Sequence, residues 1–153
     1  MYNKILVAVD GSENALRAVG EAVRMASGNP GARISLITVV PLINPVFGYG
    51  PLVTSQQVED AERKAEDEVL KKAEEVVSQA KQAAELAETA GIGVESLVQI
   101  GDPAQAITEY AAKEGYEVIV MGRRGLGMLK ELLLGSVSGK VLQAAPCPVL
   151  LVR

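Results

Sequence analysis

Short, unbroken apolar runs that alternate with helical patterns are the feature that most restricts how this chain can fold. The first run, 4–9 (Lys-Ile-Leu-Val-Ala-Val), is rich in β-branched residues, which is typical of a strand buried on both faces. Further strands are predicted at 33–40, 94–100, 117–121 and 149–152. Between these runs, apolar spacing and N-cap residues predict helices. The predicted helices cover 13–27, 54–89, 103–114 and 136–144.

Strands that are separated by helices predict a parallel sheet, because right-handed crossovers place the helices on its two faces. The predicted fold class is therefore α/β, a doubly wound sheet of five parallel strands in a single domain, residues 1–153. In such sheets, ligands bind beyond the carboxyl ends of the strands. A site is therefore expected among three loops, which begin at Asp10, Val39 and Gly122.

The residue types that the chain lacks exclude several kinds of chemistry. It has no histidine and one cysteine, Cys147, which excludes serine–histidine catalysis, internal disulfides and His- or multi-Cys zinc sites. The apolar runs are too short to span a membrane and no signal peptide is expected, so we expect a cytoplasmic protein. A net charge of −4, with four tyrosines and one phenylalanine, does not fit a basic, aromatic-rich surface for nucleic acid.

A glycine-rich, locally basic segment follows the fourth predicted strand. It begins Gly122-Arg-Arg-Gly-Leu-Gly and ends on Gly135-Ser136, directly before a predicted helix. Glycines let the backbone approach a ligand, and the unpaired amides of a helix N-terminus favour phosphate. The hydroxyls of Ser136 and Ser138 would add donors. A plain glycine loop with a serine N-cap fits the same residues, whereas P-loop and dinucleotide fingerprints do not fit the spacing.

Three landmarks of the sequence occur in an order that resembles a known family. The chain opens on an apolar strand followed by Asp10-Gly-Ser, and it closes on Ala145-Pro-Cys-Pro before its last apolar strand. Between them stand glycines with two and then nine intervening residues: Gly122, Gly125, Gly135 and Ser136. From residue 2 to residue 153, the chain resembles the universal stress proteins. The resemblance implies an adenine-nucleotide alpha-hydrolase-like sheet with strand order 3-2-1-4-5 that binds ATP, with Mg²⁺ on the phosphates.

The resemblance also implies roles for individual residues. Asp10 would hydrogen-bond the ribose hydroxyls, although a capping carboxylate is the alternative. The backbone of Val39 or Val40 would meet the adenine edge, beside a pocket lined by Ala8 and Val9. The contacts implied to ribose and phosphates are those of Met121, Gly122 and Gly125, and, at the phosphate tail, of Gly135, Ser136, Val137 and Ser138.

Several functions remain open from the sequence. The first is a regulatory module whose surface or assembly changes with ATP or another adenine nucleotide. The second is a slow ATPase or phosphoryl-transfer enzyme, with Arg123, Arg124 and Lys130 supplying charge but no base fixed by the motif. The third is a partner-binding protein with an empty site. The resemblance implies a homodimer through the last strand, and the roles of Arg123 and Arg124, near phosphate or in water, stay open.

Overall fold

A five-stranded parallel sheet forms the centre of the molecule. The structure, a computed structural model, describes residues 1–42, 54–126 and 134–153. The strands are β1 (Lys4–Ala8), β2 (Arg33–Val40), β3 (Gly93–Ile100), β4 (Val118–Gly122) and β5 (Val149–Val152). Their order in the sheet is β3-β2-β1-β4-β5, so the predicted α/β class and the implied order 3-2-1-4-5 are both confirmed.

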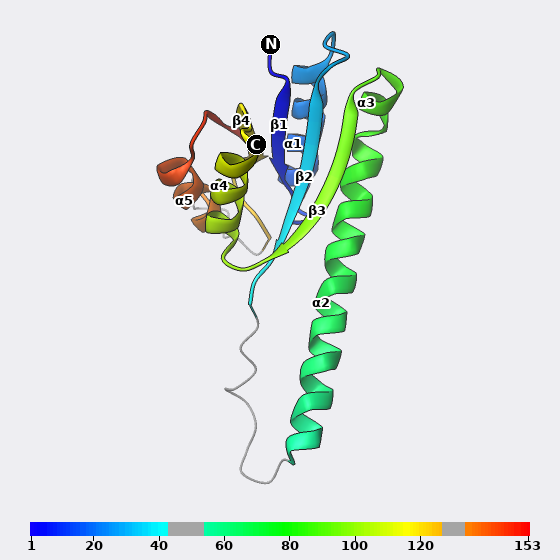
Figure 1. Cartoon of the computed structure of the whole chain (residues 1–153), viewed down its shortest axis with the longest axis vertical. Coiled ribbons are helices and arrows are strands. Elements are labelled where there is room, and N and C mark those ends of the chain that lie inside the picture. Colours follow the sequence, from blue (N-terminus) through cyan, green and yellow to red (C-terminus); the bar gives the residue numbers. More distant parts are fainter. Residues whose placement is uncertain (43–53, 127–133) are drawn as a thin grey trace.

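Helices cover both faces of this sheet (Figure 1). They are α1 (Glu13–Ala26), α2 (Ser55–Ala83), α3 (Glu85–Thr89), α4 (Pro103–Glu114) and α5 (Ser136–Ala144). The single helix predicted at 54–89 is thus interrupted at Ala84, which has φ −98° and ψ 0°. The interruption turns the short α3 away from the α2 axis and lets Ala84 and Ala87 both bury in the core.

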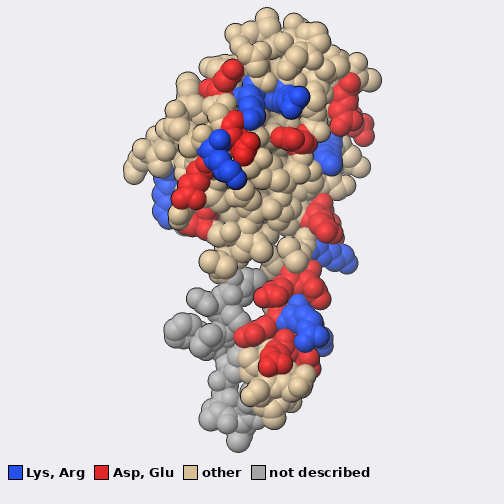
Figure 2. Space-filling model, viewed as in Figure 1, with Lys and Arg blue, Asp and Glu red and all other residues tan. Residues whose placement is uncertain are grey.

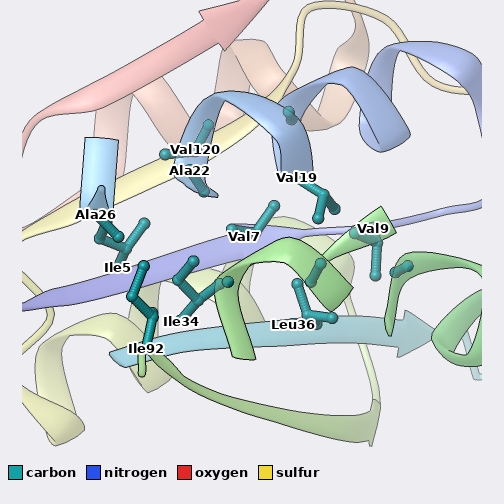
Figure 3. Close-up of a cluster of buried hydrophobic side chains, with 14 of the residues drawn as sticks. Ile5, Val7, Val9, Val19, Ala22, Ala26, Ile34, Leu36, Ile92 and Val120 are labelled. Atoms are coloured by element: carbon teal, nitrogen blue, oxygen red, sulfur yellow. The ribbon is translucent and has the colours of Figure 1, made fainter. Parts of the chain in front are cut away.

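The core on one face of the sheet packs α1 and the C-terminal part of α2 against β1, β2 and β4. Ile5 and Val7 of β1, and Val9 directly after it, belong to this side of the core together with Val19 of α1. Figure 3 shows these side chains between the helix and Ile92, which precedes β3. On the opposite face, α4 and α5 cover the other residues of the strands, among them Leu6 and Ile119. Both faces are apolar, as the unbroken runs predict.

The N-terminal half of α2 extends beyond the edge of the sheet (Figure 1). The helix begins with a capping box between Thr54 and Gln57, and its fully buried residues are Ala73 and Ala80. Acidic and basic side chains are interspersed along the projecting half (Figure 2). Within α2, Nζ of Lys72 lies 3.2 Å from Oε1 of Glu68. No helix in the described ranges is long and apolar enough to cross a membrane.

Candidate functional site

A cavity of about 260 Å³ lies at the carboxyl ends of β1, β2 and β4. The loops after these three strands, together with the first turns of α4 and α5, form its walls. The cavity occupies the position at which ligands bind in doubly wound sheets. All but one of the residues named from the sequence line it: Ala8, Val9, Asp10, Val39, Met121, Gly122, Gly125, Gly135, Ser136, Val137 and Ser138.

The exception is Val40, and strand geometry explains why. The Arg33 amide donates to the Asn3 carbonyl, and the Ile37 carbonyl accepts from Val9, so the odd-numbered residues of β2 turn their backbone groups toward β1. The Val40 carbonyl instead accepts from the Gly101 amide on the β3 side, at 2.9 Å. Because this alternation has a period of two residues, the backbone of Val39 faces the side on which β1 has already ended. Val39 is therefore the better placed of the two.

One part of the cavity is apolar, and several residues that line it were not predicted from the sequence. Besides Val39 and Met121, the side chains of Ile37, Pro103 and Ile107 line it. Ile37 lies two residues before Val39 on the same face of β2, so period-two alternation was a signal that could have found it. Pro103 and Ile107 belong to α4, whose approach to the cavity depends on tertiary packing and has no signal in the local sequence.

Asp10 joins two of the loops around the cavity. Its Oδ1 accepts a hydrogen bond from the Ser12 amide at 2.9 Å, and its Oδ2 accepts one from the Leu126 amide at 3.2 Å. The first bond shapes the turn that leads into α1, where Ser12 is the N-cap and accepts from the Ala15 amide. The carboxylate thus has a capping role, as the alternative interpretation expected, and Asp10 also lines the cavity.

The glycines of the motif differ in what surrounds them. A Cβ on Gly122 would lie 2.9 Å from Cβ of Asn14 and 3.1 Å from the Ala15 amide nitrogen, so Gly122 allows α1 to pack against the end of β4. A Cβ on Gly125 would instead lie 2.5 Å from Oδ2 of Asp10. Gly122 is therefore required by the fold itself, whereas Gly125 is required by a group that lines the cavity.

The N-terminus of α5 forms a polar end of the cavity. Gly135 is its N-cap and supplies no side chain to the first-turn amides, which belong to residues that line the cavity. The Arg123 carbonyl accepts from the Gly135 amide at 2.9 Å and from the buried Ser138 hydroxyl at 2.8 Å. Ser138 therefore lines the cavity while its hydroxyl holds the loop, and Ser136 is the exposed hydroxyl at this end. Unpaired amides and the helix dipole make this end suited to an anion.

The paired arginines after β4 are not equivalent. Arg124 lines the cavity, whereas Arg123 does not and uses its amide to donate to the Val152 carbonyl of β5 at 2.8 Å. Lys130, the third cation considered from the sequence, lies outside the described residues. Within those residues, no cluster of three or more Asp, Glu, Cys or His side chains has the arrangement needed to hold a metal ion.

An ion pair connects the two helices that wall the cavity from the α4–α5 face. Asp102, the N-cap of α4, accepts from the Gln105 amide at 3.0 Å, and Nζ of Lys140 in α5 lies 3.7 Å from its Oδ2. The hydrogen bond from Gln105 lowers the pKa of the Asp102 carboxyl, and the charge of Lys140 lowers it further. Asp102 itself does not line the cavity, although the next residue, Pro103, does.

Comparison with known proteins identifies the family. The model of the universal stress protein family matches residues 1–153. This chain belongs to the universal stress protein family. The "Universal stress protein in QAH/OAS sulfhydrylase 3'region" of Thermus aquaticus is 40% identical over 154 residues, with all of both chains covered. The resemblance inferred from the three landmarks is thereby confirmed.

Solved structures of similar proteins agree with the fold. The structure of hypothetical protein MJ0577 matches with a TM-score of 0.76 and 28% identity, over 99% of this chain and 96% of that one. A universal stress protein described as in complex with cAMP matches with a TM-score of 0.66 and 26% identity, over 99% and 97%. The second of these holds an adenine nucleotide on the same fold.

Proposed function

We propose that this universal stress protein binds ATP in the cavity and acts as a nucleotide-dependent regulatory module with little or no turnover. The observation that carries the proposal is the juxtaposition, within one cavity, of an apolar wall and the uncapped N-terminus of α5. An adenine ring needs an apolar slot with a few polar groups at its edge, and a phosphate chain needs backbone amides and positive charge. The cAMP complex of a relative supports adenine as the base.

In this proposal, each cavity residue has one role. The base lies against Ala8, Val9 and Met121, with the Val39 backbone at its edge, and Asp10 accepts from the ribose hydroxyls. The phosphates lie at the Gly122–Gly125 loop and at the amides of Gly135, Ser136, Val137 and Ser138. Mg²⁺ binds with ATP through phosphate oxygens and water, since Mg²⁺ in nucleotide sites keeps several waters and few protein ligands.

The binding experiment uses the purified full chain. Nucleotide released by acid from freshly purified protein is identified by chromatography, and the emptied protein is then titrated with ATP in a calorimeter. We expect bound adenine nucleotide, or saturable ATP binding at one site per chain. Asp102→Ala provides the matched control for Asp10→Ala, because it also removes an aspartate carboxylate. Asp102 is the N-cap of α4 and does not line the cavity. Failure of the wild-type chain to bind any adenine nucleotide would disprove the proposal.

Turnover is tested separately from binding. Protein loaded with ATP and Mg²⁺ is incubated for hours, and the ADP that forms is measured against a protein-free sample. We expect little ADP, because the carboxylate lining the described part of the cavity, Asp10, already accepts two amide hydrogen bonds. ADP that forms at a steady rate and is lost in Asp10→Ala would instead favour the slow ATPase.

We also propose that the protein is a cytoplasmic homodimer that pairs through β5. This strand lies at one edge of the sheet, and Leu150 at its centre is 38% exposed. An exposed apolar edge strand leaves backbone groups free to pair, and a twofold antiparallel contact would pair the β5 edges of the two subunits with each other. Residues 1–153 form one domain in this proposal, and the cytoplasm is the compartment that supplies ATP.

A further inference from the structure

Two neighbouring arginines of identical chemistry differ in their relation to the cavity. Arg124 is half-buried and lines the cavity, and Arg123 is half-buried but does not line it. The backbone of Arg123 is committed on both sides, since its amide donates to Val152 and its carbonyl accepts from Gly135 and Ser138. These bonds fix the peptide that precedes Arg124 and hence the point from which its side chain starts.

That starting point lies directly against the N-terminus of α5. A Cβ on Gly135 would be 3.5 Å from Cα of Arg124 and 3.3 Å from the Arg123 carbonyl oxygen. The Arg124 backbone and the N-cap of α5 are therefore in contact, and a side chain at position 135 would crowd the Arg123 carbonyl oxygen. Arg124, which lines the cavity, therefore starts at the end of the cavity where the helix dipole supplies a partial positive charge.

Few charged side chains line the cavity, so each of them should have a large effect on how a charged ligand binds. Among the lining residues in the described part of the chain, Arg124 carries the only positive side chain and Asp10 the only negative one. Asp10 belongs to the loop after β1, and Arg124 belongs to the loop after β4 beside α5. A guanidinium presents its N–H donors in a fixed fork that matches phosphate oxygens, often two at a time.

We infer that Arg124 sets the preference of this site for the number of phosphates on its nucleotide, and that Arg123 has no part in it. The inference rests on the proposed function and deepens it. Adenosine, AMP, ADP and ATP share the same base and ribose, so the groups around Val39 and Asp10 treat the four alike. Discrimination among them comes from the phosphate end, where the attraction to one fixed cation grows with the negative charge of the ligand.

The test is a comparison of four ligands across four proteins. Dissociation constants for adenosine, AMP, ADP and ATP are measured by calorimetry, at fixed salt and without added metal, for the wild type, Arg124→Gln, Arg124→Lys and Arg123→Gln. Arg124→Gln is expected to weaken ATP roughly ten- to hundredfold, the range for a charge-assisted hydrogen bond. It weakens AMP less and leaves adenosine within about twofold, since adenosine carries no charge for the arginine to attract.

The other two variants separate position from charge. Arg123→Gln removes the same charge one residue away and leaves all four affinities within about twofold, because Arg123 does not line the cavity. Arg124→Lys keeps the charge without the planar fork and lies between the wild type and Arg124→Gln for ATP. Thermal unfolding of each ligand-free variant shows which of them fold. If Arg124→Gln does not fold, the wild-type and Arg124→Lys proteins are compared across a salt series.

The outcomes distinguish this inference from the proposed function. If the wild-type protein binds none of the four compounds, the proposed function is wrong and this inference fails with it. If the wild type binds them, but Arg124→Gln weakens adenosine as much as ATP, or Arg123→Gln has the same effect as Arg124→Gln, the inference alone is overturned. In the salt series, ATP binding by the wild type and by Arg124→Lys should weaken as salt rises, because both carry the charge, whereas adenosine binding should change little. Equal salt slopes for ATP and adenosine would overturn the inference.

Discussion

Gly125 and Asp10 belong to different loops, yet they lie so close that a Cβ on Gly125 would stand 2.5 Å from Oδ2 of Asp10. The same Oδ2 accepts the amide of the next residue, Leu126, at 3.2 Å. The glycine therefore leaves the space in which the carboxylate sits, and the following amide holds the carboxylate there. A change at either residue is expected to act through the other.

This coupling can be measured with a double-mutant cycle. Gly125→Ala should lower the free energy of unfolding of the ligand-free protein, because the new methyl group displaces the Asp10 carboxylate from the Leu126 amide. In an Asp10→Ala background the same substitution should cost less, giving a coupling free energy of roughly 0.5–3 kcal/mol. Urea unfolding of the four proteins provides the values. Strictly additive effects would show that the two residues do not constrain each other.

Asp10→Ala should also weaken ATP binding if the carboxylate accepts from the ribose. The expected loss is roughly 1–3 kcal/mol, the range for a hydrogen bond to a charged group. Calorimetry at equal folded fraction measures it, with Asp102→Ala as the control that keeps normal affinity. Unchanged affinity in Asp10→Ala would remove the ribose role and leave the carboxylate as a cap alone.

Gly122→Ala should destabilise the protein whether or not nucleotide is present. The new Cβ would lie within 3.1 Å of backbone atoms of α1, and overpacking of this kind costs about 1–3 kcal/mol. Gly20→Ala, in the middle of α1 where a Cβ would meet no atom within 4 Å, is the control. It should stabilise by about 0.5–1 kcal/mol. Equal unfolding midpoints for the two variants would contradict the packing argument.

Leu150→Lys should convert the proposed dimer to a monomer. The substitution places a charge at the centre of the β5 edge, which discourages strand pairing but is tolerated in water. Sedimentation should change from about 32 kDa, twice the 16.1 kDa of the chain, toward the mass of one chain. Ile100→Lys is the control, because it charges an exposed apolar residue at the opposite edge and should leave the dimer intact. A wild-type protein that is monomeric at tens of micromolar would refute the dimer.

The Asp102 cap predicts a pH dependence. Its pKa is lower in the folded protein than in the unfolded chain, chiefly because the carboxylate accepts from Gln105. The stabilisation is therefore complete above the unfolded pKa of about 3.9 and is lost as the pH falls through the lower folded value. The stability difference between the wild type and Asp102→Asn should follow this course in acid unfolding curves, because asparagine caps without titrating. If the stability difference between the wild type and Asp102→Asn is the same at pH 2 and pH 6, the predicted pH dependence is wrong.

The sequence was sufficient for the sheet and for most of the cavity, because both follow from local patterns. Apolar runs such as 33–40 predict buried strands. In a parallel sheet, the loops that follow the carboxyl ends of the strands all lie at the same edge of the sheet. The role of Ile107 could not be predicted, since it depends on how α4 packs across the sheet. Nor could the difference between Arg123 and Arg124, because adjacent identical residues are told apart only by what their backbone groups bond to.

The sequence left open a break in the long helix, but the position of that break was beyond prediction. Nothing in the alanine-rich sequence around Ala84 interrupts a helical pattern, and the interruption follows from the docking of Ala84 and Ala87 into the core. The end of β1 shows the same limit on a smaller scale. Val9 was assigned to the strand but follows it, although its amide still bonds to the Ile37 carbonyl.

The two halves of α2 should differ greatly in how easily they unfold, because only the second half packs on the core. From Ala73 onward, the helix is anchored by buried alanines, so its amides exchange with solvent only when the core itself comes apart. Before that point it depends on the capping box at Thr54, on good helix formers and on pairs such as Glu68 with Lys72, which support a helix only marginally in water. Fraying should therefore start at Ser55 and stop near Ala73, so a protease should cut the first five turns of α2 before it cuts the rest of that helix.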